Sequence, residues 1–367
     1  MSSINLDSVY AALRTVNDPD LKRDLVSLNM VKDVKIHEND VLVVIELTTP
    51  ACPLKDKIKD DCIEAIKSHI PSVRNITIEM TANVRSNIDA RKNQILPGVK
   101  NTIAVASGKG GVGKSTVAVN IAIALAKLGG KVGLIDADIY GPSIPLMLGI
   151  KEKPKVFQDI QTAKMIPLEN YGIKVISIGF LIEDDAPVIW RGPMASGAIK
   201  QFMSDVHWDE LDYLIFDLPP GTGDIQLTLV QTIPLTGAVV VTTPQDVSLI
   251  DVKKAIRMFQ RVNVPILGIV ENMSYFIAPD TNKKYDIFGS GGGSKLANEL
   301  SLTLLGAIPI NPNIRIGGDE GKPIVFSDPE SEEAVKIFEI SKNLAAQISI
   351  NNLSSKIPQI DISLGDN

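Results

Sequence analysis

A loop rich in glycine and lysine is the strongest chemical signal in the sequence. It reads GKGGVGKST and fits the spacing GxxxxGK[ST]. Glycines let the backbone wrap a polyphosphate with its N–H groups pointing inward, and a following helix adds its dipole. Lys114 is then expected to reach the β- and γ-phosphates, and the Ser115 hydroxyl to ligate Mg²⁺. The predicted ATP-binding loop comprises Gly108, Lys109, Gly110, Gly111, Val112, Gly113, Lys114, Ser115 and Thr116.

The same glycines permit a dinucleotide-binding interpretation. Three of them also spell GxGxxG, and Asp136 ends the next apolar run, about where such a fold places its ribose-binding acid. A dehydrogenase, however, has no use for Lys114 and Ser115 at the helix start. The dehydrogenase interpretation also does not explain Asp217, which ends another apolar run, where a carboxylate on the Mg²⁺ side of a nucleotide site would lie. A nucleoside triphosphatase explains both features, and we therefore favour it.

These side chains need elements that bring them together. From Asn101 onward, short apolar runs alternate with helical stretches, as expected for buried parallel strands with right-handed crossovers. The predicted fold is α/β: a doubly wound, mostly parallel sheet of six to eight strands, with helices on both faces. The predicted strands are Thr102–Ala106, Val132–Ile135, Ile173–Ile178, Tyr213–Phe216, Ala238–Val241, Ile266–Val270 and Leu304–Ile308.

A different pattern of apolar residues precedes this domain. Helical spacing over residues 6–16 is followed by two β-branched runs, a helix that opens at Pro53, and a further strand over Val73–Met80. The order α-β-β-α-β predicts a small α+β domain. The predicted division is a small domain at 1–85, a linker at 86–99, an ATPase domain at 100–349 and a flexible tail at 350–367.

Composition narrows the functional classes. With 367 residues, a net charge of -6 and 44% apolar residues, the chain is ordinary globular material, and a nucleic-acid partner is not expected. No apolar run approaches the roughly 18 residues that span a bilayer, and the first residues lack a secretory pattern, so we expect a cytoplasmic protein without a membrane partner. Two cysteines exclude a disulfide framework and a four-thiolate site within one chain.

Lys109 is a second lysine inside the loop, and ordinary phosphate loops do not need it. In this respect the chain resembles the deviant Walker A group typified by MinD, ParA and the nitrogenase iron protein. The resemblance implies a homodimer in which Lys109 reaches the ATP of the partner subunit. It also implies that Asp138 orients or activates the attacking water, that Asp217 holds Mg²⁺ together with Ser115, and that Asn272 binds adenine. The implied catalytic residues are Lys109, Lys114 and Asp138.

Four further segments resemble the Mrp/ApbC family of ATP-binding iron–sulfur carriers. They are Asp136–Ser143 (DADIYGPS), Trp190–Met194 (WRGPM), Asp217–Asp224 (DLPPGTGD) and Glu271–Tyr275 (ENMSY). The segment LTTPACP at residues 47–53 resembles the SufT-type domain often fused in front of such ATPases. This family implies slow, Mg²⁺-dependent ATP hydrolysis coupled to handling of a [4Fe–4S] cluster by a homodimer, with iron–sulfur scaffold and client apoproteins as partners.

The chain departs from this family at the cluster ligands. Members usually carry CPxC after ENMSY, so that two chains supply four thiolates, whereas here Ala278 and Thr281 stand at those positions. Neither side chain replaces a thiolate as a cluster ligand. The chloroplast and cyanobacterial branch, which the chain resembles, also tends to lack the pair.

The two cysteines present lie in the N-terminal domain. Cys52 precedes Pro53, and we expect it at a helix N-terminus, where the dipole lowers a thiol's pKa. A cluster ligand, a transfer thiol and an inert buried thiol all stay open for it. Cys62 falls on an apolar helix face, and we expect it in the core.

The predicted function is an ATPase that binds, carries or delivers iron–sulfur clusters as a homodimer. One alternative is a nucleotide-gated adaptor in iron–sulfur assembly that carries no cluster, which the missing CPxC pair favours. A positioning ATPase like MinD or ParA is another. MinD would need a basic amphipathic C-terminal helix and ParA a basic surface, which the last residues and the pI of about 5.3 do not offer.

Overall fold

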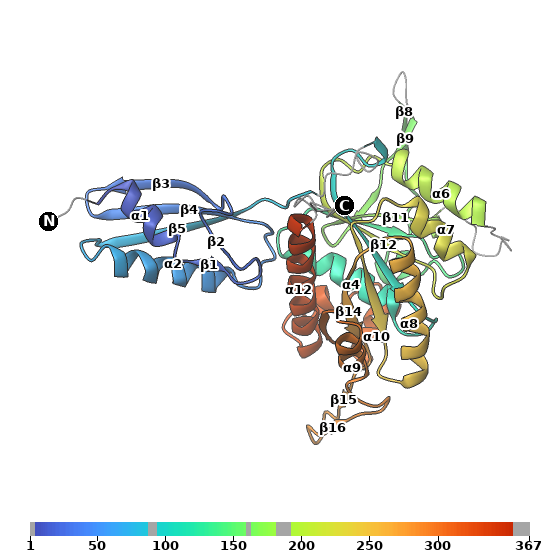
Figure 1. Ribbon diagram of the computed structural model, residues 1–367. Helices are drawn as coiled ribbons and strands as arrows, with labels where there is room; N and C mark the ends of the chain where they lie inside the picture. Colours follow the sequence, from blue (N-terminus) through green and yellow to red (C-terminus); the bar gives the residue numbers. More distant parts are fainter. Residues whose placement is uncertain (1–3, 87–93, 159–162, 181–191, 355–367) are drawn as a thin grey trace, which may run out of the picture. The chain divides into compact units, whose positions relative to one another are not determined.

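The computed structural model of the chain describes residues 4–86, 94–158, 163–180 and 192–354. The chain divides into two compact units, which are considered separately (Figure 1). One unit comprises Met1–Asn87 together with Ala346–Asn367, and the other comprises Ile88–Ala345.

The N-terminal residues form a three-stranded sheet covered by two helices. Its elements are α1 (Leu6–Leu13), the short β1 (Asn17–Asp18) and β2 (Arg23–Asp24), β3 (Val31–His37), β4 (Asp40–Leu47), α2 (Lys55–His69) and β5 (Asn75–Ala82). Strand β4 lies in the middle, antiparallel to β3 and parallel to β5. Alternate residues of β4 are buried, and they pack with the apolar faces of both helices. The predicted α-β-β-α-β order is confirmed.

The second unit is built on an eight-stranded sheet. Its order is β10 (Leu168–Asn170), β11 (Ile173–Ser177), β7 (Val132–Asp136), β12 (Leu211–Asp217), β6 (Val99–Ser107), β13 (Gly237–Thr242), β14 (Ile266–Glu271) and β17 (Leu304–Ala307). All neighbours are parallel except the edge pair β10 and β11. The predicted α/β class is therefore confirmed, and each predicted strand overlaps an observed one. The last predicted strand ends one residue early, at Ala307.

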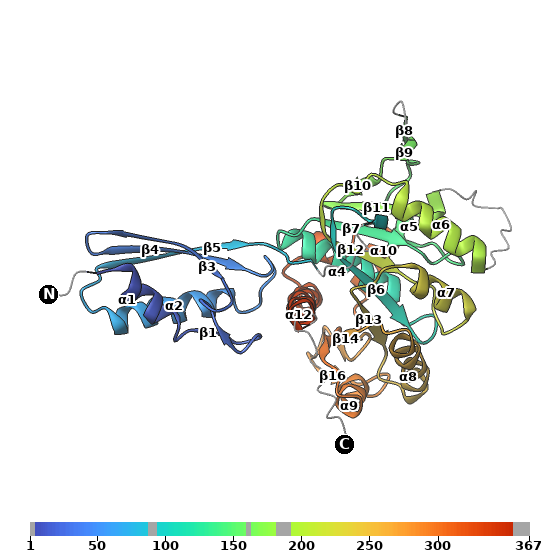
Figure 2. The same ribbon diagram turned by 45° about the horizontal axis from the view of Figure 1, so that its top comes forward.

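Helices cover both faces of this sheet. Helix α4 (Lys114–Lys127) packs on one face, and α6 (Gly192–Ser204), α7 (Asp224–Thr232) and α8 (Asp246–Arg261) lie on the other (Figures 1 and 2). All side chains of α4 from Val117 to Leu125 are buried, so it is a core helix rather than an amphipathic surface helix. The doubly wound arrangement places the loops that follow β6, β7, β12 and β14 along one carboxyl edge.

The remaining elements are short except for the last helix. They are α5 (Ile144–Met147), β8 (Val156–Gln158), β9 (Ala163–Met165), the 3₁₀ turn Ile178–Phe180, β15 (Phe276–Ile277), β16 (Lys284–Tyr285), α9 (Gly292–Glu299), α10 (Pro312–Asp319), α11 (Ile324–Ser327) and α12 (Glu332–Ser354). Helix α12 packs on β17, where the Asn343 side chain donates to the Leu305 carbonyl at 2.8 Å.

The C-terminal tail begins later than the sequence indicates. Residues 350–354 continue α12, and Asn352 is buried there, because no glycine or proline stops the helix before Pro358. The rest of the predicted tail lies outside the described residues. Within the described ranges, no helix combines the length and the apolar character needed to cross a membrane.

Candidate functional site

The glycine-rich loop joins β6 to α4 in a conformation that requires its glycines. Gly111 and Gly113 both have φ of +79°, in the left-handed region that side chains rarely adopt. Gly113 caps α4, and a Cβ there would lie 2.3 Å from Nδ2 of the Asn272 side chain. A Cβ on Gly108 would lie 2.3 Å from the Asp251 carbonyl carbon in α8. The loop is thus packed between α8 and the loop that follows β14.

Lys114 lies at the centre of a buried charge cluster. Its Nζ is 2.5 Å from Asp217 Oδ1, at the end of β12, and 3.6 Å from Asp138 Oδ2, in the loop after β7. The same Nζ lies 3.2 Å from the Ser115 hydroxyl. The Lys114 side chain is 6% exposed and that of Asp217 is fully buried. The structure therefore brings together four of the predicted site residues from three separate segments.

The two carboxylates keep one oxygen each without a partner. Among the described residues, neither Asp138 Oδ1 nor Asp217 Oδ2 has a hydrogen bond, although both atoms are buried. Buried carboxylate oxygens without donors are costly, and they are the hard ligands that Mg²⁺ prefers. Burial, opposed by the nearby Lys114, raises the pKa of Asp138 above its usual value. With the Ser115 hydroxyl beside them, these residues fit a Mg²⁺ site.

Asp136 holds the loop that carries Asp138. Its buried carboxylate accepts from the Ser177 hydroxyl at 2.8 Å, from the Asp138 amide at 3.2 Å and from the Ile144 amide at 3.3 Å. Burial and the charge of Asp217 raise the pKa of Asp136. Ser177, at the end of β11, was not singled out in the sequence, because a single serine after an apolar run gives no signal of its own.

Lys109 lies apart from this cluster. It is half-buried, and its Nζ is 3.5 Å from the side-chain oxygen of Gln245, just before α8. A single long contact leaves the side chain free to take other rotamers. Its predicted role across a dimer interface stays a prediction.

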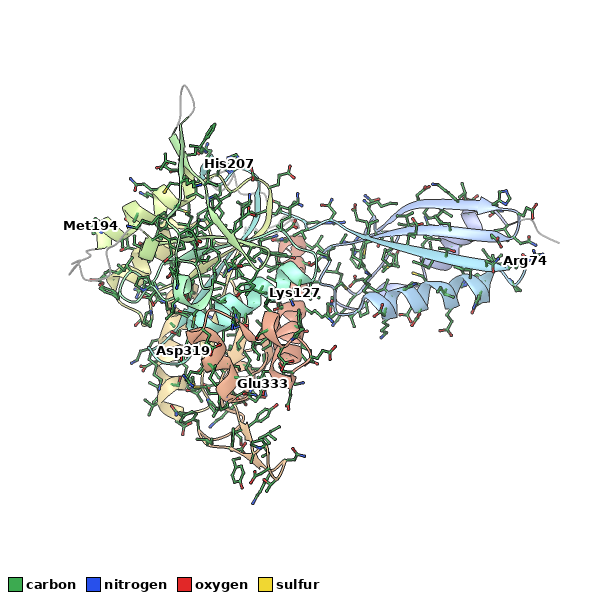
Figure 3. All side chains as sticks on the ribbon, turned by 180° about the vertical axis from the view of Figure 1, so that it is seen from behind. Arg74, Lys127, Met194, His207, Asp319 and Glu333 are labelled. Atoms are coloured by element: carbon green, nitrogen blue, oxygen red, sulfur yellow. The ribbon has the colours of Figure 1, made fainter. Side chains whose placement is uncertain are left out.

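A cavity of about 540 Å³ opens beside the glycine-rich loop. Asn272 lies at its inner wall and donates its side-chain amide to the Val112 carbonyl at 2.9 Å. The far wall belongs to the segment after β17 and to α10, whose Asp319 is labelled in Figure 3. Arg315 of the same helix pairs with Asp319 at 2.5 Å. The size and largely apolar lining suit a nucleoside. Sequence reasoning missed the wall residues Pro309, Ile310, Asn311, Pro312 and Arg315.

Cys52 does not lie at the helix start that the sequence predicts. Helix α2 begins at Lys55, with Leu54 as its cap, so Cys52 precedes the helix by three residues. Burial raises the pKa of its thiol to about 11, against a smaller lowering by the Leu54 amide. The prediction of a lowered pKa for the Cys52 thiol is therefore wrong. Cys62 is fully buried in the core of the N-terminal unit, as expected.

The positions of the family's usual cluster cysteines form a turn. Ala278 and Thr281 lie between β15 and β16, where the Ala278 amide donates to the Lys283 carbonyl at 3.0 Å and the Ala278 carbonyl accepts from the Asn282 amide at 2.8 Å. No group of three or more His, Cys, Asp or Glu side chains suited to a metal ion occurs among the residues described. Of the segment Trp190–Met194, the first two residues lie outside the described ranges, and Gly192 begins α6.

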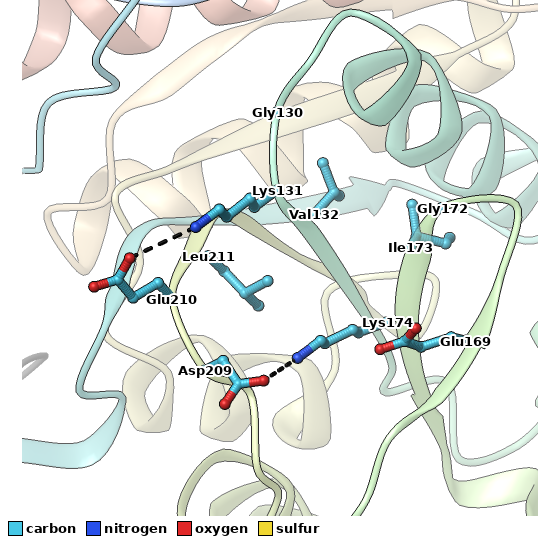
Figure 4. A pocket seen from close by; sticks show the side chains of 10 residues that line it. All are labelled: Gly130, Lys131, Val132, Glu169, Gly172, Ile173, Lys174, Asp209, Glu210 and Leu211. Atoms are coloured by element: carbon cyan, nitrogen blue, oxygen red, sulfur yellow. Dashed lines mark hydrogen bonds and ion pairs between the residues drawn. The ribbon is translucent and has the colours of Figure 1, made fainter.

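A second hollow, of about 570 Å³, lies at the opposite edge of the sheet, where β7, β11 and β12 begin. Lys131 pairs with Glu210 at 3.6 Å, and Lys174 pairs with Asp209 (Figure 4). Because both lysines are already neutralised by carboxylates on the same rim, this hollow is poorly suited to phosphates. The carboxyl edge is therefore better suited to a nucleotide than this hollow.

Comparisons with known proteins agree with this geometry. The family model of the NUBPL iron-transfer P-loop NTPases matches residues 98–345, and that of an iron-sulfur cluster assembly protein matches residues 6–79. The chain is 51% identical over 349 residues to an iron-sulfur cluster carrier protein of Synechocystis sp., covering 95% of this chain and 99% of the relative. An iron-sulfur cluster carrier protein of Deinococcus radiodurans is 49% identical over 356 residues, covering 97% and 99%.

A solved structure supports the fold of the larger unit. The nucleotide-binding protein of Archaeoglobus fulgidus, in complex with ADP, is 39% identical, with a TM-score of 0.57. The match covers 68% of this chain and 99% of that one. The family resemblance predicted from the sequence is confirmed for both parts of the chain.

Proposed function

Because this chain belongs to the family of NUBPL iron-transfer P-loop NTPases, we propose that it hydrolyses ATP with Mg²⁺ to bind, carry or deliver iron–sulfur clusters to apoproteins as a homodimer. The observation that carries the ATPase part is the buried cluster of Lys114, Asp138 and Asp217, with two carboxylate oxygens left without partners. The carrier part is supported by relatives named iron-sulfur cluster carrier proteins that match almost the whole chain.

The proposed chemistry follows from the geometry of the cluster. The loop amides and Lys114 bind the phosphates, so Lys114 exchanges its contact with Asp217 for one with the nucleotide. Ser115 and Asp217 would hold Mg²⁺, which would supply charge neutralisation at the phosphate oxygens. Asp138 orients the attacking water, and its raised pKa suits a group that accepts a proton. Lys109 of a second copy completes the site by delivering a cation in trans. Asn272 and the adjoining cavity bind the base.

The ATPase proposal is tested by release of phosphate with and without Mg²⁺. For Asp138→Asn we expect turnover to fall by about 100-fold or more, while binding of a fluorescent ATP analogue stays within a few fold. Equal turnover in the variant and the wild type would remove Asp138 from the mechanism. Turnover that does not depend on a divalent cation would remove the Mg²⁺ site.

The carrier proposal is tested by anaerobic reconstitution with iron and sulfide. Iron, sulfide and the visible spectrum are measured for the wild type, for Cys52→Ala and for Cys62→Ala as the matched control. A stable cluster that is lost only in Cys52→Ala identifies a carrier whose ligand lies in the N-terminal unit. Cluster uptake that neither variant affects would place the ligands elsewhere.

One observation favours the adaptor as a second candidate. The segment that would hold the cluster is a hairpin turn with Ala278 and Thr281, and neither can ligate iron. If the wild type takes up no cluster yet hydrolyses ATP, the chain is a nucleotide-gated adaptor of iron–sulfur assembly. ATP-dependent co-purification with assembly proteins would then be the measurement to make.

A further inference from the structure

Two buried polar side chains near the nucleotide site have no assigned task. Among the residues that the structure describes, both amide atoms of Gln226 and the hydroxyl of Thr243 are buried without a hydrogen-bond partner. Gln226 is 2% exposed and Thr243 is 4% exposed. A glutamine amide can make up to four hydrogen bonds, so burial without any is costly. Such groups are rare in folded proteins and call for an explanation.

Gln226 is tied to the loop that carries Asp217. It lies in the first turn of α7, directly after the segment 217–223. Gly221 in that segment has φ of +96° and donates its amide to the Ser107 carbonyl at 3.0 Å. A Cβ on Gly221 or Gly223 would meet nothing within 4 Å. The segment therefore has both the backbone freedom and the space to change its arrangement, and such a change would move the start of α7.

Thr243 approaches the same loop from the neighbouring strand. It follows β13, whose Val241 is paired with Ser107 of β6. Two residues farther on, Gln245 contacts Lys109. The Ser248 hydroxyl accepts from the Thr243 amide at 3.4 Å, so the backbone is held in place here. The Thr243 hydroxyl itself has no hydrogen-bond partner among the described residues. The strand register thus puts one unpartnered group beside the start of the glycine-rich loop, and the Gly221 contact links the segment before Gln226 to the same point.

We propose that Gln226 is a positioning residue whose side-chain amide gains its hydrogen bonds only when the segment 217–223 takes its nucleotide-bound arrangement. The arrangement in which the Gln226 amide has no partner is then destabilised relative to the bound arrangement, in which the amide has its hydrogen bonds. This difference favours the bound arrangement and tightens ATP binding without any contact between Gln226 and ATP. The proposal rests on the ATP binding proposed above, and Thr243 is a candidate partner in the bound arrangement.

The test is Gln226→Met, which keeps the shape of the side chain and removes the amide. Both tryptophans of the chain, Trp190 and Trp208, belong to the larger unit, so the fluorescence of thermal unfolding reports on that unit. Without nucleotide we expect the Tm of the variant to rise by about 2–4 °C, because an unsatisfied polar group has been replaced by an apolar one. With ATP and Mg²⁺, we expect the nucleotide-induced rise in Tm to shrink and the half-saturating ATP concentration to increase about fivefold or more.

Thr243→Val is the second variant. If the Thr243 hydroxyl and the Gln226 amide meet in the bound arrangement, this variant should also raise the Tm without nucleotide and weaken the response to ATP. Gln260→Met, at an exposed position of α8, is the matched control and should change neither quantity. A variant that gains stability yet keeps the wild-type response to ATP would overturn the proposal, as would one that changes neither quantity. If the wild type itself shows no ATP-induced shift, the proposed ATP binding fails, which is a different result.

Discussion

Lys114 occupies a position where a cation is needed with and without nucleotide. In the structure it neutralises the fully buried Asp217 and lies close to Asp138. In the proposed mechanism its charge would lie against the phosphates, while Ser115 and Asp217 would hold Mg²⁺. The same residue therefore contributes to the stability of the chain and to its proposed affinity for the nucleotide.

Lys114→Met should therefore destabilise the chain even without ATP. Removing one partner of a buried ion pair typically costs about 3–5 kcal/mol, because the other charge is left buried alone. Unfolding in urea, followed by tryptophan fluorescence, measures the loss. The double variant Lys114→Met/Asp217→Asn should lose less than the sum of the single variants, because no buried carboxylate is stranded at position 217. Additive losses would show that the contact carries no coupling.

The Cys52 thiol should be unreactive at neutral pH. Its pKa is raised from 9.0 to about 11, so the neutral form is favoured in the folded chain and the thiolate appears only as the pH rises toward 11. At pH 8 the thiolate fraction, and with it the rate of alkylation by iodoacetamide, should be about 100-fold below that of the urea-unfolded chain. The measurement is a pH series of labelling in Cys62→Ala. Rapid labelling of the folded chain at pH 8 would instead indicate a thiol with a lowered pKa.

At the scale of elements, the glycine-rich loop is shaped by what packs against it. Gly108 lies against the backbone of α8, whereas a Cβ on Gly110, two residues later, would meet only a Pro220 side-chain carbon at 4.0 Å. Neither glycine has a positive φ. The two positions therefore differ only in the room that each leaves for a side chain.

Gly108→Ala and Gly110→Ala form a matched pair for this packing. The first substitution forces the loop and α8 apart, since a Cβ cannot approach a carbonyl carbon to 2.3 Å, and we expect a loss of at least about 2 kcal/mol. The second has room, and we expect a loss below about 1 kcal/mol. Chemical denaturation of both variants without nucleotide gives the comparison. Equal losses would contradict the packing argument.

The elements were predictable where the signal is local. The strand runs and the spacing GxxxxGK[ST] predict β6, the loop and α4 without any tertiary information. The contact of Lys114 with Asp217 joins residues 103 positions apart. The position of Asp217 at the end of an apolar run and the family resemblance both placed it at the phosphate site, but neither predicted the direct contact. The support of Asp136 by Ser177 and the unpartnered amide of Gln226 gave no signal, because both depend on packing. The pKa of Cys52 was mispredicted because burial outweighs a helix that begins three residues later.

At the scale of the whole molecule, the proposed dimer would make each site depend on two chains. Among the described residues, the Lys109 side chain has one hydrogen bond, at 3.5 Å to Gln245, while Lys114, Asp138 and Asp217 form a closed cluster. One site would thus combine three residues of its own chain, Lys114, Asp138 and Asp217, with Lys109 from the second chain.

Mixing two inactive variants should restore activity if this division is correct. Lys109→Ala keeps its own carboxylates but donates no lysine, and Asp138→Asn donates the lysine but cannot orient water. In a mixed dimer, the intact site of the first variant receives Lys109 from the second. With equal amounts we expect about a quarter of the wild-type turnover, since half of the dimers are mixed and each has one working site. No recovery in the mixture would show that Lys109 acts within its own chain.

The neutral thiols of the N-terminal unit have a consequence for life under oxidative stress. Burial raises the pKa of Cys62 to about 12, as it raises that of Cys52 to about 11. Peroxide attacks thiolates, so neither sulfur should advance readily to sulfenic or sulfinic acid. Both thiols would therefore stay intact when peroxide destroys a cluster that the chain is proposed to handle. The chain could then be loaded again once iron and sulfide are available. Mass spectrometry of the peroxide-treated chain should find both cysteines unmodified.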